Sequence, residues 1–159
     1  MGRYSREELE GAFETFKATA DKASETGDWK LWAALFTEDA RYIEHAYGEF
    51  HGRAAIEEWI VKVMAPFPTM TFPHNWSVID EANDAVIFEV ENVLPPPNRP
   101  DGTPYAFPNW TRIVYGGGGK WASEEDVYNP TKDGGPVLKA WIEAGGKFKS
   151  EEQVEMVHR

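Results

Sequence analysis

Four segments in the second half of the chain alternate between apolar and polar residues, and this pattern is the strongest constraint on the fold. The segments run over residues 72–80, 85–94, 106–115 and 120–129. Successive side chains of a β-strand point to opposite faces, so the alternation predicts strands that bury one face. Turn-forming residues at Glu81–Asp84 and Gly116–Gly119 join the segments pairwise. We therefore expect two antiparallel hairpins that form one sheet.

The first half of the chain is predicted to be mostly helical. Ser5 and Glu8 have the spacing of a capping box, and apolar residues with helical spacing follow as far as Gly27. A short helix after Asp28 and a third helix that stops before Pro66 are expected next, with a short strand pair over residues 40–52 between them. Pro136 opens a last helix. Helices packed against a mainly antiparallel sheet make an α+β fold.

Composition limits the kinds of partner. The chain has 159 residues, which fits a single domain; we assign 1–145 to it and 146–159 to a polar C-terminal tail. Its net charge is 16 − 27 = −11, which argues against nucleic acid and anionic membranes as partners. It has no Cys, and its four His residues lack metal-binding spacing, so we expect neither a metal nor a cofactor. No secretion signal is evident, which predicts a cytoplasmic location.

Three motifs occur in a characteristic order and spacing. They are Asp28–Ala40 (DWKLWAALFTEDA), Gly48–Gly52 leading into Arg53–Ile56, and the final Asp126–Pro130. Together they resemble the NTF2-like superfamily, and its SnoaL-like branch in particular. The resemblance covers about residues 5–130.

This resemblance implies a cone-shaped, strongly curved antiparallel or mixed sheet with helices packed on its concave face. It also implies a pocket for a small hydrophobic molecule and, often, a homodimer formed through the outer face of the sheet. Members include ketosteroid isomerase, scytalone dehydratase, limonene epoxide hydrolase and polyketide cyclases, as well as proteins without catalysis. The fold therefore leaves the reaction open.

Strand alternation places Tyr42 and Glu44 on one face of the first strand. In the resemblance, Glu44 falls where ketosteroid isomerase keeps its general base, and Tyr42 where the epoxide hydrolase orients water. One extra residue before Gly48 leaves His45 as the alternative inward residue. Glu44 could instead pair with Arg41 or Arg53 at the strand edge.

Further candidates lie on the later strands. Asp126 corresponds to a pocket carboxylate of the epoxide hydrolase, but Val90 and Asn92 replace that enzyme's Arg and second Asp. Thr111 stands where ketosteroid isomerase has a protonated Asp. The predicted catalytic residues are Glu44, Asp126 and Tyr42, and the predicted substrate-binding residues are His74, Trp76, Phe88, Val90, Asn92, Asn109 and Tyr128.

A carboxyl group in an apolar cavity has a raised pKa and can exchange protons near neutral pH. The sequence thus favours a cofactor-independent isomerase, dehydratase or cyclase that acts on a hydrophobic cyclic or polyketide-like substrate. A non-catalytic ligand-binding or dimerisation domain and an epoxide hydrolase remain as alternatives.

Overall fold

The computed structural model describes residues 2–157 and contains four α-helices and six strands in that part of the chain. The helices are α1 (Arg6–Thr26), α2 (Lys30–Ala33), α3 (Arg53–Met64) and α4 (Gly135–Glu143). The strands are β1 (Phe36–Glu44), β2 (Gly48–His51), β3 (His74–Asp80), β4 (Ala85–Val93), β5 (Ala106–Gly117) and β6 (Lys120–Val127). A 3₁₀ turn η1 (Glu81–Asn83) and a π turn η2 (Pro130–Gly134) complete the list.

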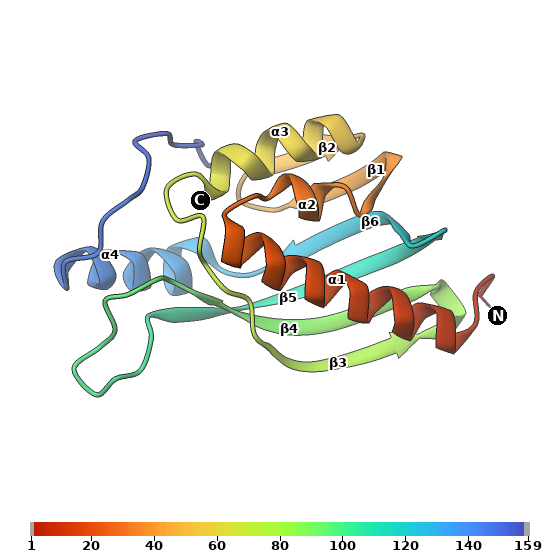
Figure 1. Ribbon diagram of the computed structural model, residues 1–159, viewed down its shortest axis with the longest axis horizontal. Coiled ribbons are helices and arrows are strands. Elements are labelled where there is room, and N and C mark those ends of the chain that lie inside the picture. Colours follow the sequence, from red (N-terminus) through yellow and green to blue (C-terminus); the bar gives the residue numbers. More distant parts are fainter. Residues whose placement is uncertain (1, 158–159) are drawn as a thin grey trace.

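All six strands form one mixed sheet in the order β2-β1-β6-β5-β4-β3. Its pairs are antiparallel except for β1 with β6, which run parallel. The two late hairpins are therefore confirmed as β3–β4 and β5–β6. The sheet curves beneath α1, α2 and α3, which cover one of its faces, so the predicted α+β arrangement is confirmed (Figure 1).

Local signals in the sequence account for both ends of α1. The Ser5 side chain accepts a hydrogen bond from the Glu8 backbone N–H at 3.2 Å, which satisfies one of the free donors of the first turn. Gly27 ends the helix with φ of 74°, a left-handed conformation that glycine adopts without strain. Its N–H donates to the Ala23 carbonyl. The helix therefore has the length that its capping residues predict.

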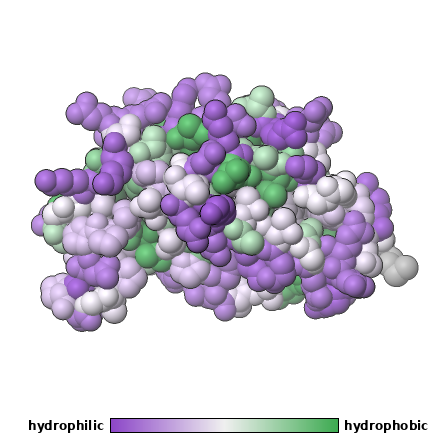
Figure 2. Space-filling view, viewed as in Figure 1, coloured by the Kyte–Doolittle hydropathy of each residue, from purple (hydrophilic) through white to green (hydrophobic). Residues whose placement is uncertain are grey.

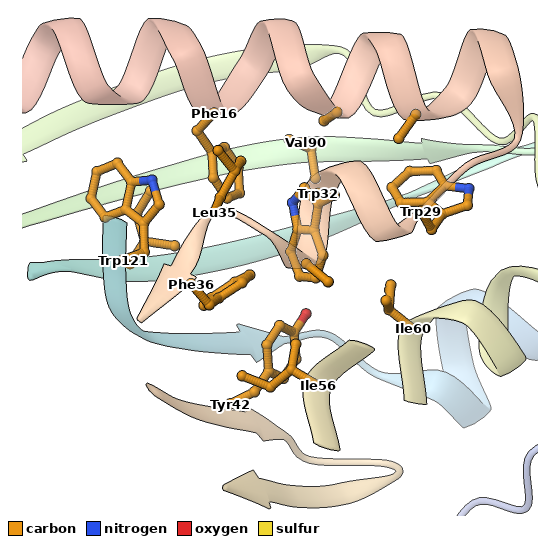
Figure 3. Packing of buried hydrophobic residues seen from close by; sticks show 14 of the residues in the cluster. Phe16, Trp29, Trp32, Leu35, Phe36, Tyr42, Ile56, Ile60, Val90 and Trp121 are labelled. Carbon is orange, nitrogen blue, oxygen red and sulfur yellow. The ribbon is translucent and has the colours of Figure 1, made fainter. Parts of the chain in front are cut away.

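Large aromatic side chains fill the space between the helices and the sheet. Phe16 from α1, Trp32 from α2 and Trp121 from β6 are buried there, and their rings meet edge to face (Figure 3). Aromatic side chains bury about 150–250 Å² each and dominate the energetics of a core. Tyr42 joins this layer from β1, with its hydroxyl directed into the interior (Figure 3).

The first strand differs from its predicted extent. It begins at Phe36, four residues before the predicted start at residue 40, and its register with β6 shifts between Phe36 and Arg41. The irregular pairing lets Phe36 enter the core while Tyr42 and Glu44 keep their alternation farther along.

The predicted polar tail has no helix or strand over residues 146–157, yet it packs against the rest of the protein. The Lys149 N–H donates to the Pro66 carbonyl at 2.7 Å, and the Val157 N–H donates to the Ala46 carbonyl at 2.8 Å. The tail thus connects α4 with the loop after α3 and the turn after β1, and Figure 1 shows it in dark blue along that path.

Hydrophilic residues cover most of the helix-bearing side, and hydrophobic ones show in small groups near its middle (Figure 2). Within residues 2–157, none of the helices is both long and apolar enough to span a bilayer.

Candidate functional site

A cavity of about 340 Å³ lies between the helices and the inner face of the sheet. Residues from α1, α2, α3, α4 and five strands line it, and most of them are apolar. The predicted site residues that line it are Tyr42, Glu44, His74, Phe88, Val90, Asn92, Asn109, Asp126 and Tyr128. Nine of the ten predicted residues therefore meet at one cavity.

The two ends of the cavity differ in chemistry. One end, here called the aromatic end, consists of Phe16, Trp29, Trp32, Phe72 and Phe88. The other, here called the carboxyl end, contains the three acidic side chains Glu44, Glu124 and Asp126. The two groups adjoin, because Trp32 packs on Tyr42 at 5.8 Å and Phe88 pairs with Thr111, which in turn pairs with Asp126.

Asp126 is held by three donors from neighbouring strands. The Thr111 hydroxyl donates to its Oδ1 at 2.6 Å, the Asn109 amide donates to the same oxygen at 3.1 Å, and the Tyr42 hydroxyl donates to Oδ2. Burial raises the pKa of Asp126, whereas the three donors favour the ionised form and oppose that rise. The result is a rigidly oriented carboxylate in an apolar surrounding.

Glu124 belongs to the same network as Asp126. Its Oε1 accepts a hydrogen bond from the Tyr42 hydroxyl at 3.3 Å, so Glu124 and Asp126 share the one proton of that phenol. Burial, followed by the nearby charge of Asp126, raises the pKa of Glu124 well above its ordinary range. The neutral form of Glu124 is therefore favoured.

Glu44 occupies the other side of the carboxyl end. The Ala46 N–H donates to its Oε1 at 2.7 Å, and the Tyr128 hydroxyl donates to its Oε2 at 3.0 Å. Burial raises the pKa of Glu44 to about 7, although both donors favour the ionised form. Glu44 therefore exchanges its proton close to neutral pH.

The structure settles the two sequence alternatives for the orientation of Glu44. Residues 45–47 form the turn before β2, which absorbs the extra residue. His45 points outward and lies 2.9 Å from Glu125. Arg41 forms a bidentate pair with Glu49. Glu44 consequently faces the cavity without an Arg partner.

His74 lies at the start of β3, two strands away from Asn109 across the sheet. Its ring packs on Phe13 and Phe88 at centroid distances of 5.4 and 4.8 Å. Burial and the nearby Lys17 lower the pKa of His74, so the neutral imidazole is favoured. It forms a polar edge of the aromatic end.

Trp76 is the predicted residue that the structure places elsewhere. A shift of register between His74 and Trp76 inserts one extra residue into β3, so Trp76 pairs with Glu89 and points to the outer face of the sheet. There its ring meets Trp110 edge to face at 5.3 Å. Strict two-residue alternation from His74 was wrong here because a bulge reverses the phase of a strand.

Sequence reasoning did not select several side chains that shape the cavity. Glu124 shares the inward face of β6 with Asp126, so alternation alone could have found it. Trp59 of α3 and Met156 of the tail also line the cavity. The helical spacing around Trp59 indicates a core position and not a site, and no local pattern marks Met156. Among residues 2–157 no three acidic or His side chains are arranged to hold a metal ion.

The family model that matches this chain is the SnoaL-like domain, over residues 16–124. The chain belongs to the SnoaL-like domain family. A search of the curated proteins found no sequence that matches this SnoaL-like protein.

Solved structures share the fold of this SnoaL-like protein at low sequence identity. A protein of ketosteroid isomerase-like fold from Catenulispora acidiphila, in complex with trimethylamine, is 22% identical, with a TM-score of 0.59 over 77% of this chain and 95% of that one. An LEH-like epoxide hydrolase from Mycobacterium tuberculosis is 15% identical, with a TM-score of 0.62 over 87% and 95%. Another Mycobacterium tuberculosis protein, in complex with estradiol-17beta-hemisuccinate, is 11% identical, with a TM-score of 0.58 over 74% and 94%. The fold is therefore of the NTF2-like, ketosteroid isomerase-like type.

Proposed function

We propose that this SnoaL-like protein is a cofactor-independent enzyme that transfers a proton next to a carbonyl or hydroxyl group of a hydrophobic cyclic substrate. The observation that supports this most directly is the carboxyl end, where Glu44 has a pKa of about 7 at the edge of an apolar cavity. A general base works best when its pKa lies near the operating pH. Isomerisation, dehydration and cyclisation all need such a group.

Glu44 is the proposed base. An ionised carboxylate offers about four acceptor positions, and only two of those on Glu44 are taken, by Ala46 and Tyr128. Asp126 has three of its positions filled, so we assign it the role of orienting Tyr42. The one proton of Tyr42 is already engaged by Asp126 and Glu124, so Tyr42 positions these carboxyl groups and does not itself donate to the substrate.

The alternatives have less support. A binding domain without catalysis has no need for three carboxyl groups in its pocket, since each costs free energy to bury. Epoxide hydrolysis is supported by the fold of one structural neighbour. Against it, Val90 and Asn92 occupy the wall where that chemistry would require an Arg and a second Asp.

Exchange of carbon-bound hydrogen tests the proposal without knowledge of the natural substrate. Cyclic ketones of steroid, terpenoid and aromatic polyketide type are incubated with the protein in D₂O, and deuterium uptake next to the carbonyl is followed by mass spectrometry. We expect Glu44→Gln to slow the exchange by about 10²–10⁴-fold, because this is the usual contribution of a general base. Glu49→Gln removes an exposed carboxylate of β2 and serves as the matched control. Exchange that is equally fast in E44Q would contradict the assignment.

We also propose that the outer face of the sheet pairs with a second copy of the chain. Trp76, Val78, Trp110 and Val127 are exposed on this face, with Trp110 at 53% and Val127 at 55%. A group of large apolar side chains in solvent is typical of an interface. Light scattering is expected to give the mass of a dimer for the wild type and a monomer for Trp110→Glu; a monomeric wild type at micromolar concentration would rule the dimer out.

A further inference from the structure

The carboxyl end of the cavity lacks a positive partner within the protein. Three acidic side chains lie there, whereas no Lys or Arg of residues 2–157 lines the cavity. His74 is two strands away from Asn109, and its pKa is lowered. Buried carboxylates are ordinarily paired with a cation or a metal. The negative charge of these carboxyl groups is therefore neutralised either by bound protons or by a cationic ligand.

Two buried oxygen atoms at this end have no hydrogen-bond partner. Glu124 Oε2 and Asn109 Oδ1 have no hydrogen-bond partner, and the two residues are only 4% and 8% exposed. Glu124 Oε1 is engaged with Tyr42, which leaves Oε2 as the unpartnered oxygen of this side chain. Asn109 already uses its amide group on Thr111 and Asp126, which leaves its oxygen as an acceptor. Both side chains line the cavity, and both lack a donor.

The walls around Glu44 favour a cation as well. Trp59 packs between Tyr42 and Tyr47, at centroid distances of 4.9 and 6.0 Å, and Tyr128 lies against Phe107 at 5.8 Å. The faces of aromatic rings carry partial negative charge and attract ammonium groups. All these rings line the cavity. An anionic group would meet carboxyl oxygens and ring faces with no cation to compensate it.

We propose that the natural ligand of this cavity carries a protonated amine on an otherwise apolar frame, and that its ammonium group binds at the carboxyl end. The inference rests on the proposed function only in taking the cavity as the substrate site. The amine supplies N–H donors to the unpartnered oxygens. It also supplies a positive charge close to Glu44 and Asp126, which have no cationic partner in the protein. The apolar frame fills the aromatic end.

The expected size of the effect follows from linkage. An opposite charge within about 4–6 Å lowers the pKa of a carboxyl group by about 1–3 units. By reciprocity, ionisation of that carboxyl strengthens amine binding by about 10- to 1,000-fold. The titratable groups that face Glu44 are Asp126 of β6, the phenols of Tyr42, Tyr47 and Tyr128, and the outward-pointing His45. Glu44 itself, with a pKa of about 7, changes charge between pH 6 and pH 8.

A comparison of three ligands with the same rigid hydrocarbon cage separates the effect of ligand charge on affinity from the effect of ligand shape. 1-Adamantylamine is a cation, 1-adamantanol is neutral and adamantane-1-carboxylate is an anion. Calorimetry at pH 7.5 is expected to give an affinity for the amine at least about tenfold above that for the alcohol, and no binding of the carboxylate. The amine stays protonated below about pH 9, so its affinity should rise from pH 6 to pH 8 as Glu44 ionises, whereas that of the alcohol should not.

Variants assign the effect to the cavity. Glu44→Gln and Asp126→Asn should each remove most of the preference for the amine while they leave the affinity for the alcohol within about threefold. Glu125→Gln removes one charge from the outer face of β6, next to Asp126 in sequence, and is expected to retain the preference. Two independent variants keep the test valid if one of them fails to fold.

Amine binding no tighter than alcohol binding, including no binding of either, would overturn the inference. So would a preference that survives both Glu44→Gln and Asp126→Asn. Hydrogen exchange on neutral ketones is a separate readout, so loss of the amine preference with exchange intact refutes this inference alone. If the amine preference is observed but no hydrogen exchange is found, the proposed reaction is refuted and the amine site is retained.

Discussion

The two ends of the cavity differ in what they contribute to the folded state. At the aromatic end, Phe16 meets Trp32 and Phe88 at centroid distances of 6.1 and 5.7 Å, and Trp29 meets Phe72 at 5.4 Å. Removal of these rings from water stabilises the fold. At the carboxyl end, Glu44, Glu124 and Asp126 lose hydration with incomplete compensation. The two groups of side chains that line this cavity thus serve stability and chemistry respectively.

The largest expected effect comes from the aromatic end. Trp32 packs edge-on against Phe16, Phe36 and Tyr42, and Trp32→Ala should lower the free energy of unfolding by about 3–5 kcal/mol. Urea denaturation monitored by circular dichroism measures this loss. A loss below about 1 kcal/mol would mean that the aromatic end is not a stabilising core.

A smaller effect of opposite sign is expected at the carboxyl end. The pKa of Glu44 rises from about 4.5 to about 7 in the folded state, so the folded protein binds more protons than the unfolded chain between these values. Its contribution to stability is full below about pH 4.5 and is lost as the pH rises to about 7. The loss amounts to about 3 kcal/mol at 1.36 kcal/mol per pKa unit.

Glu44→Gln removes this titration. We therefore expect E44Q to be about as stable as the wild type at pH 5 and more stable by up to about 3 kcal/mol at pH 8. Thermal unfolding over that range compares the two proteins, and Glu49→Gln again controls for net charge. Parallel stability curves for E44Q and the wild type would show that Glu44 titrates normally.

The smallest effect concerns a single donor. The Tyr128 hydroxyl donates to Glu44 and favours its ionised form, so Tyr128→Phe should raise the pKa of Glu44 further, by about one unit. The carboxyl resonance of Glu44 in carbon-detected NMR titration reports this shift. An unchanged midpoint would indicate that the desolvated surroundings alone determine the proton affinity of Glu44.

Short-range signals in the sequence predicted much of this molecule. Capping by Ser5, the stop at Gly27 and the end of α3 before Pro66 are local properties, and the structure agrees with them. Alternation on β4 and β6 correctly directed Val90 and Asp126 inward. These features depend on residues that lie a few positions apart.

The failures come from long-range structure. The bulge that turns Trp76 outward is a property of the pairing between β3 and β4, which alternation within one strand does not reveal. The contact between Glu124 and Tyr42 joins residues that are 82 positions apart in the chain. Met156 lines the cavity because the tail docks at Pro66 and Ala46 through backbone hydrogen bonds, which are independent of side-chain type.

The central position of β6 in the sheet affects how the site assembles during folding. Glu44 and Asp126 become neighbours only when β6 inserts between β1 and β5, a pairing across about 80 residues that loop-closure entropy makes slow. Until then each acid is hydrated and fully charged at neutral pH. The insertion of β6 brings like charges into an apolar space, so mildly acidic conditions, which neutralise them beforehand, should accelerate the final folding step.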